Sequence, residues 1–151
     1  MKLFLDCEFN EFGGELISMA LVSEDGKHEF YEVLRYPEKP GAFVAEHVLP
    51  KLGKMAIGEK DFDEELARFQ GWEPDCEIYA DWPADFEHLC ACLSRAGRAQ
   101  GFSIPIECSM HLIRGDATIA PENPHNALSD ARALRDWWQR THGQIEEREA
   151  R

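Results

Sequence analysis

Long apolar runs are missing from this chain of 151 residues. A membrane-spanning helix needs about 20 consecutive apolar residues, and no run of even roughly 18 occurs here. The apolar start at residues 1–5 is interrupted by Asp6, which makes it too short for a signal peptide, and no small-residue cleavage site follows. We therefore expect no membrane association and a cytoplasmic location.

Cysteines number only five, and their spacing does not suggest a disulfide framework. They are Cys7, Cys76, Cys90, Cys92 and Cys108. The Cys90-Ala91-Cys92 segment has no partner Cys-x-x-Cys motif or histidine pair, so we expect buried thiols rather than a zinc site.

Positive charge is also scarce, because 16 Lys and Arg residues face 29 Asp and Glu residues and the net charge is −13. This balance disfavours nucleic-acid binding, since Lys and Arg dominate contacts with phosphates. One physical exception exists. Acids that cluster around divalent cations reverse the local field that a phosphate meets.

The remaining composition is that of one globular domain, with 44% hydrophobic and 30% charged residues. A chain of this length buries a sizeable core. We predict a single domain over residues 1–142 and a flexible charged tail over residues 143–151.

Apolar periodicity and turn signals predict an alternation of strands and helices. The predicted strands cover residues 2–7, 15–23, 28–34, 76–80 and 102–107, and the predicted helices cover residues 42–49, 61–70, 83–96 and 126–140. This order predicts an α/β fold, in which a mixed sheet opens with antiparallel strands, continues through parallel crossovers and is flanked by helices.

Individual residues set several of these boundaries. Asp25-Gly26 indicates a hairpin, Pro50 is expected to end the first helix, and Asp61 to cap the second. Gly97 is expected to interrupt the third helix, and Gly143 to follow the last one. Pro105 makes its strand an edge strand, and residues 110–124 are expected to form a loop.

Asp6 and Glu8 are the first acids found where apolar residues belong. They are one residue apart, so both point to the same face of an extended strand. Two neighbouring carboxylates repel each other, and a divalent cation would relieve that repulsion. The alternative is that the strand has ended and both acids face solvent.

The last helix carries another acid inside its apolar stripe. Asp130 lies beside Ala127 and Ala131, at least one turn into the predicted helix, and His125 lies near the helix start. Because a buried carboxylate is costly unless it is paired or binds metal, Asp130 is a functional candidate. The alternative is an acid that the positive end of the helix favours.

The segment Asp81-Trp82-Pro83-Ala84-Asp85 directly follows the predicted strand 76–80. Both acids can reach a site at the carboxyl end of the sheet, where α/β proteins usually bind ligands. An Asp before a helix that begins with proline is an ordinary cap. We therefore assign the cap to Asp81 and the functional role to Asp85.

These acids and their order along the chain resemble the three motifs of the DnaQ-like, DEDDh 3′→5′ exonucleases. The likeness spans residues 2–140 and is strongest over His125–Ala131. The resemblance implies an RNase H-like fold and an active site of Asp6, Glu8, Asp85, His125 and Asp130. A tyrosine-type relative would place its tyrosine where Asn126 stands here, so the histidine type is favoured.

More narrowly, the chain is similar to the small stand-alone bacterial 3′→5′ exoribonucleases first described in mycobacteria. That likeness lies in Leu5–Phe9, Glu15–Ser18, Val48–Leu52 and His125–Leu128. Two departures stand out. Many family members have Thr or Thr-Gly where this chain has Phe9-Asn10, and many have Phe where it has Ala84, which keeps Asp81 open as the second-motif acid.

The resemblance implies two divalent ions, Mg²⁺ or Mn²⁺, which prefer the hard oxygen ligands that carboxylates supply. Asp6, Glu8 and Asp130 would hold one ion, and Asp6 and Asp85 the other. Such a metal pair activates water and stabilises the phosphorus and the leaving oxygen. His125 would act as the general base.

The expected substrate is the 3′ end of a short single-stranded nucleic acid, with RNA favoured over DNA by the narrower likeness. Phe9, Phe12 and Trp82 are candidates for stacking on its bases, although aromatic residues beside strands more often belong to the core. A homodimer is expected by resemblance alone. Two other functions stay open, namely an RNase H-like endonuclease or phosphodiesterase, and a non-catalytic RNA-binding module on the same fold.

Overall fold

The computed structural model describes residues 1–35, 39–69, 71–100, 107–116 and 118–149. Five strands form one mixed sheet in the order β3-β2-β1-β4-β5. The elements in chain order are β1 (Lys2–Phe9), β2 (Leu16–Ser23), β3 (Glu29–Val33), η1 (Val44–Val48), η2 (Leu49–Lys51), α1 (Glu59–Arg68), β4 (Cys76–Ala80), α2 (Pro83–Gln100), β5 (Cys108–Leu112) and α3 (Ala127–Glu149).

The sheet has the predicted division into an antiparallel and a parallel half. β1 pairs with β2, and β2 with β3, in antiparallel fashion, whereas β1 pairs with β4, and β4 with β5, in parallel. The predicted hairpin turn at Asp25-Gly26 joins β2 to β3, and Gly26 takes a positive φ of 69° there. The predicted α/β fold with a mixed, RNase H-like sheet and flanking helices is therefore confirmed.

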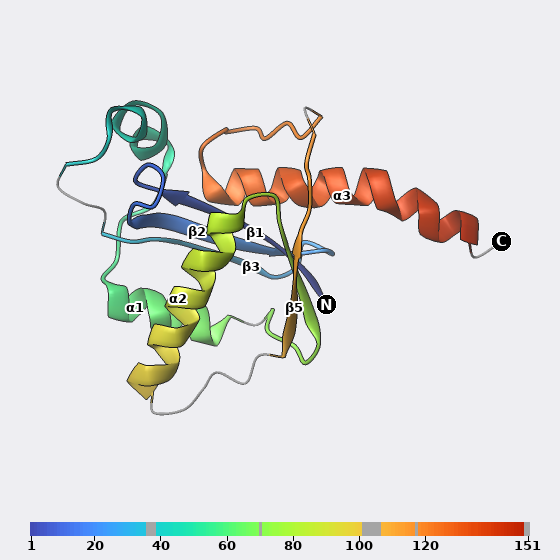
Figure 1. Cartoon of the computed structure of the whole chain (residues 1–151), viewed down its shortest axis with the longest axis horizontal. Helices are drawn as coiled ribbons and strands as arrows, with labels where there is room; N and C mark the ends of the chain where they lie inside the picture. Colours follow the sequence, from blue (N-terminus) through green and yellow to red (C-terminus); the bar gives the residue numbers. More distant parts are fainter. Residues whose placement is uncertain (36–38, 70, 101–106, 117, 150–151) are drawn as a thin grey trace.

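Helices cover both faces of the sheet (Figure 1). On one face, Leu3 and Leu5 of β1 share a buried cluster with Leu66 of α1 and Leu89 of α2. On the other face α3 packs closely, because its small residue Ala131 meets Ala20 of β2. β1 thus lies at the centre of the sheet, with a helix layer above and below it.

Several predicted boundaries are wrong. The expected helix 42–49 is mainly a π-helical turn, η1, and Pro50 does not end it but lies at the start of the 3-10 turn η2, where a missing N–H costs little. Gly58, not Asp61, precedes the first residue of α1. α2 continues through Gly97 to Gln100, since a glycine inside a helix costs only about 1 kcal/mol.

The last strand is also displaced from its predicted position. Residues 102–106 of the predicted strand lie outside the described residues, and the strand found is Cys108–Leu112, part of which was expected to be loop. β5 lies at an edge of the sheet, but Pro105, on which the edge prediction rested, lies outside the described residues. α3 runs past Gly143 to Glu149, so its predicted end near residue 140 is wrong, and Figure 1 shows its far end projecting beyond the sheet. Among the described helices, none combines the length and the apolar character needed to cross a membrane.

Candidate active site

The central strand β1 supplies two carboxylates to one face of the sheet. Leu5 and Cys7 alternate with Asp6 and Glu8 and are buried in the cluster under α1 and α2. Since alternate residues of a strand face opposite ways, the two acids point toward α3. Cys7 therefore faces away from Asp6 and Glu8, as predicted, and its Sγ lies 3.9 Å from the backbone carbonyl oxygen of Asp85.

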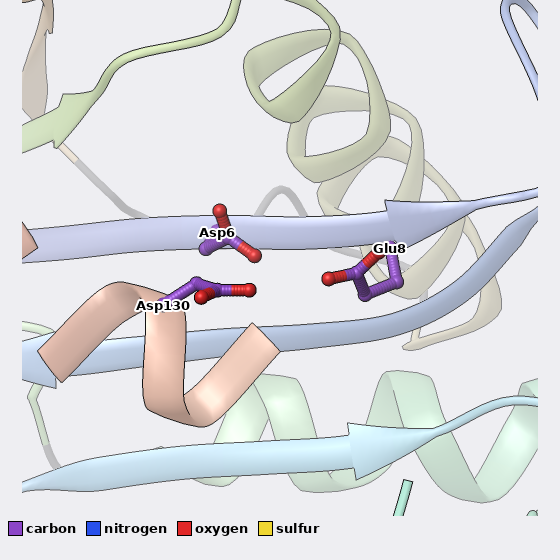
Figure 2. Close-up of side chains that lie close together, drawn as sticks. All are labelled: Asp6, Glu8 and Asp130. Atoms are coloured by element: carbon purple, nitrogen blue, oxygen red, sulfur yellow. The ribbon is translucent and has the colours of Figure 1, made fainter. Parts of the chain in front are cut away.

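α3 brings a third carboxylate to the same place. The helix begins at Ala127, so Asp130 lies in its first turn, earlier in the helix than predicted. One oxygen each of Asp6, Glu8 and Asp130 lies within 4.8 Å of the other two. Figure 2 shows these side chains converging from β1 and α3. The positive end of α3 favours the Asp130 carboxylate but does not explain three acids in contact.

The segment after β4 adds two more acids. Asp85 lies in the first turn of α2 and is only 1% exposed, and its Oδ2 is buried without a hydrogen-bond partner among the described residues. One oxygen each of Asp6, Asp81 and Asp85 lies within 4.8 Å of the other two. Asp81, which was predicted to be a helix cap, is thus part of the cluster. Asp6 belongs to both groups of three and links them.

Burial and mutual repulsion make these carboxylates hard to ionise. Burial, followed by repulsion from Asp85 and Asp130, raises the pKa of Asp6 well above its ordinary value. Burial is also the main cause that raises the pKa of Glu8 to about 8, that of Asp85 to about 8 and that of Asp130 to about 6. Bound cations would remove this penalty, because they replace the missing solvation and screen the repulsion.

The backbone holds His125 in a conformation that few non-glycine residues adopt. Its φ is +67°, and its N–H donates a hydrogen bond of 2.9 Å to Oδ2 of Asp130. The centre of its ring lies 5.1 Å from that of Phe43, edge to face. Burial, and then the positive charge of Lys51, lowers the pKa of the imidazole, which favours its neutral form. Left-handed backbone at a non-glycine residue is a common mark of functional sites.

A cavity of about 720 Å³ opens over the acids. Its lining includes Asp6, Glu8, Asp85, His125 and Asp130, which are the five residues that the sequence singled out. A second cavity of about 260 Å³ on the side of Asp81 shares Asp6, His125 and Asp130 with the first.

Aromatic side chains line the larger cavity. Phe12 is 87% exposed and lies 6.1 Å, between ring centres, from the half-exposed Trp82. Phe9 also lines the cavity but packs partly into the core, with its ring 5.0 Å from that of His88. Two exposed rings and one half-buried ring thus lie near the acids.

Sequence reasoning missed Phe43, which is half exposed and lines the larger cavity. It also missed His47, whose ring lies 4.7 Å from that of Phe43. Both come from residues predicted to form an ordinary short helix, in which a single exposed phenylalanine gives no signal. Asp81 was identified as a candidate from the sequence, but it was assigned the role of a helix cap.

The donor set suits a hard divalent cation. All the converging ligand atoms are carboxylate oxygens, which Mg²⁺ and Mn²⁺ prefer over thiolate or imidazole. The unpartnered Oδ2 of buried Asp85 is the kind of atom that an ion would satisfy. Asp6, shared by both groups, could contact two ions at once.

No family model matches this chain. It is similar to two proteins of Mycobacterium tuberculosis, from strains CDC 1551 and H37Rv, each of which is named a 3'-5' exoribonuclease. Each is 38% identical over 103 aligned residues, which cover 61% of this chain and 60% of the relative. The match thus spans less than two thirds of the length of these curated relatives.

Proposed function

We propose that this protein is a divalent-metal-dependent 3′→5′ exoribonuclease of the DEDDh type. The observation that carries the proposal is the pair of acid groups joined by Asp6, with the orphaned Asp85 oxygen in one group and His125 beside the other. The name of the mycobacterial relatives supports RNA as the substrate.

Two metal positions fit the acids. Asp6, Glu8 and Asp130 would hold one ion, and Asp6 and Asp85 the other, with Asp81 within reach of the second. Bound there, the ions would supply an activated water and stabilise charge on the phosphate and the leaving oxygen. They would also offset the negative charge of the chain where the RNA backbone enters.

His125 is the group best suited to accept a proton from the attacking water. A general base must be neutral before it acts, and burial lowers the pKa of this imidazole. Its backbone bond to Asp130 keeps the residue beside the carboxylates, while its ring faces the cavity that the acids line. Loss of the imidazole would leave the metal ligands intact and remove only the proton acceptor.

The aromatic lining would grip the end of a single strand. Phe12 and Trp82 are exposed at the cavity, and Phe9 also lines it. Stacking on such rings tolerates any base. With a net charge of −13, binding the end of a short single strand is favoured over movement along a duplex.

The test uses 5′-labelled single-stranded RNA and DNA of one sequence, with Mg²⁺, Mn²⁺ or EDTA. We expect a metal-dependent ladder that shortens by one nucleotide at a time from the 3′ end, and faster shortening of RNA. Internal fragments without a ladder would indicate an endonuclease instead. Binding without cleavage in any metal would indicate a non-catalytic RNA-binding module.

Asp85→Asn should impair turnover far more than Asp81→Asn. Asp85 is buried, with one unpartnered oxygen, whereas Asp81 is exposed to solvent at the rim of the cluster. We expect a loss of about 100-fold or more in kcat for Asp85→Asn, as for the removal of a group that stabilises the transition state, and less than tenfold for Asp81→Asn. Steady-state kinetics on a short RNA measure both variants, and the reverse order would make Asp81 the second-motif acid.

Trp82→Ala should raise KM with little change in kcat. Stacking on one base contributes about 1–3 kcal/mol, which corresponds to roughly a 5- to 150-fold increase in KM. Trp82→Phe is the matched control, because it keeps an aromatic face and should stay within a few-fold of the parent. An unchanged KM in Trp82→Ala would remove this ring from the substrate contacts.

A further inference from the structure

A buried amide joins three parts of the chain beside the site. Asn126 is 9% exposed and precedes the first residue of α3. Its Oδ1 accepts a hydrogen bond of 3.1 Å from the N–H of Ser129, which caps the helix. Its Nδ2 donates 2.9 Å to the carbonyl of Lys51 and 3.0 Å to the hydroxyl of Tyr31.

The other end of this bridge is the segment that forms one wall of the larger cavity. We call residues 41–52 the wall segment; it contains η1 and η2 and carries Phe43 and His47. Its far end is held separately, since the N–H of Gly41 donates 2.8 Å to Oδ1 of Asn10, directly after β1. The wall segment is therefore fixed at both ends by asparagine side chains, one directly after β1 and one directly before α3.

Asn126 lies directly beside two residues of the candidate site, His125 and Asp130. His125 precedes it in the chain, and the carbonyl of Asn126 accepts 3.0 Å from the N–H of Asp130. Across the bridge, the ring of Phe43 meets that of His125 at 5.1 Å. The position of the wall segment thus affects the surroundings of the imidazole.

Only an amide meets both demands at this position. The Lys51 carbonyl accepts from Asn126 Nδ2 at 2.9 Å and from Asn123 Nδ2 at a longer 3.4 Å, and the Ser129 N–H needs an acceptor. Serine would still cap the helix but is too short to make both bonds, and aspartate offers acceptors only. The Tyr31 hydroxyl strengthens the bridge, because it accepts from Asn126 and donates 2.7 Å to the carbonyl of Leu52.

We propose that Asn126 is a positioning residue that holds the wall segment, and with it Phe43, against His125 in the arrangement that RNA turnover requires. The catalytic part of this proposal rests on the proposed exoribonuclease function. The structural part, that the amide maintains the contact between Phe43 and His125, holds for the metal-free protein and can be tested without any substrate.

The first experiment records the histidine ring signals of the metal-free protein by NMR, with ¹³C-labelled histidine. Phe43→Leu defines how far the His125 signals move when the neighbouring ring current is lost. Asn126→Ser should move them in the same direction by a similar amount, whereas Tyr31→Phe, which leaves the bond to Lys51, should move them less. Unchanged His125 signals in Asn126→Ser, or in Phe43→Leu, would overturn the proposal.

The second experiment separates positioning from metal binding and from folding. Asn126→Ser should lower kcat on a short RNA about tenfold or more, while calorimetry finds Mn²⁺ affinity within about threefold of the parent. Asn126→Asp, which keeps a capping oxygen, serves if the serine variant does not fold, and should also lower kcat. A parent-like kcat in the folded variant would refute the catalytic part. If the parent protein itself cleaves no RNA, the proposed function fails, and the NMR result still decides the structural part.

Discussion

Asp6→Asn is expected to abolish metal-dependent cleavage and at the same time to stabilise the metal-free protein. Among the described residues, Asp6 is the one carboxylate that belongs to both acid groups, so its loss affects both metal positions. A loss of several kcal/mol of transition-state stabilisation corresponds to about a 1,000-fold decrease in kcat or more. The variant keeps the shape of the side chain, so the fold should be retained.

The stabilisation follows from the repulsion among the acids. Burial, and then the charges of Asp85 and Asp130, disfavour the ionised Asp6, and an amide carries no charge there. We expect a melting temperature in EDTA several degrees above that of the parent. Glu11→Gln is the matched control, because Glu11 lines the same cavity but belongs to neither acid group. An active or a destabilised Asp6→Asn variant would contradict this account of the site.

Metal-free protein should lose stability as the pH rises from about 4 to about 8. The folded-state pKa values of Glu8 and Asp85 are raised to about 8 from ordinary values of 4.5 and 3.8. In this window the folded state binds more protons than the unfolded chain, so the free energy of unfolding decreases as the pH increases. We expect the melting temperature to fall by roughly 10 °C between pH 5 and pH 8.

Divalent cations should reverse this trend. Thermal melts across the pH series, in EDTA and in Mg²⁺ or Mn²⁺, measure the effect, and the ions should raise the melting temperature more at pH 8 than at pH 5. Asp6→Asn in EDTA should give a flatter pH dependence, because it removes the charge common to both groups. A metal-free protein that gains stability between pH 5 and pH 8 would show that the acids are not clustered in solution.

Local patterns in the sequence were enough to predict most of the fold. The apolar runs over residues 2–7 and 15–23 and the turn at Asp25-Gly26 are local signals, so they identify the antiparallel half correctly. β5 was not predicted at its observed position because it is an edge strand whose apolar side chains stay largely exposed, Met110 at 40% and Leu112 at 57%. The ends of α2 and α3 were misplaced because a glycine inside a helix costs only about 1 kcal/mol and need not end it.

The five acidic and histidine candidates all line one cavity. Their separate roles were harder to assign from the sequence. Asp81 and Asp85 follow the same strand, and only the path of the chain decides that one is exposed and the other buried. Phe43 was not predicted because its position depends on the wall segment being held by Asn10 and Asn126, both far from it in the sequence.

Because the backbone at position 125 is left-handed, stability and activity are expected to favour different residues there. A non-glycine residue at a φ of +67° costs about 1–3 kcal/mol, which glycine would largely avoid. In a saturation library at position 125 sorted only for resistance to heat or proteolysis, glycine should therefore be enriched over histidine. The same library sorted for RNA cleavage should retain histidine, so comparing the two enrichments would measure how much thermostability this protein gives up at that position in favour of turnover.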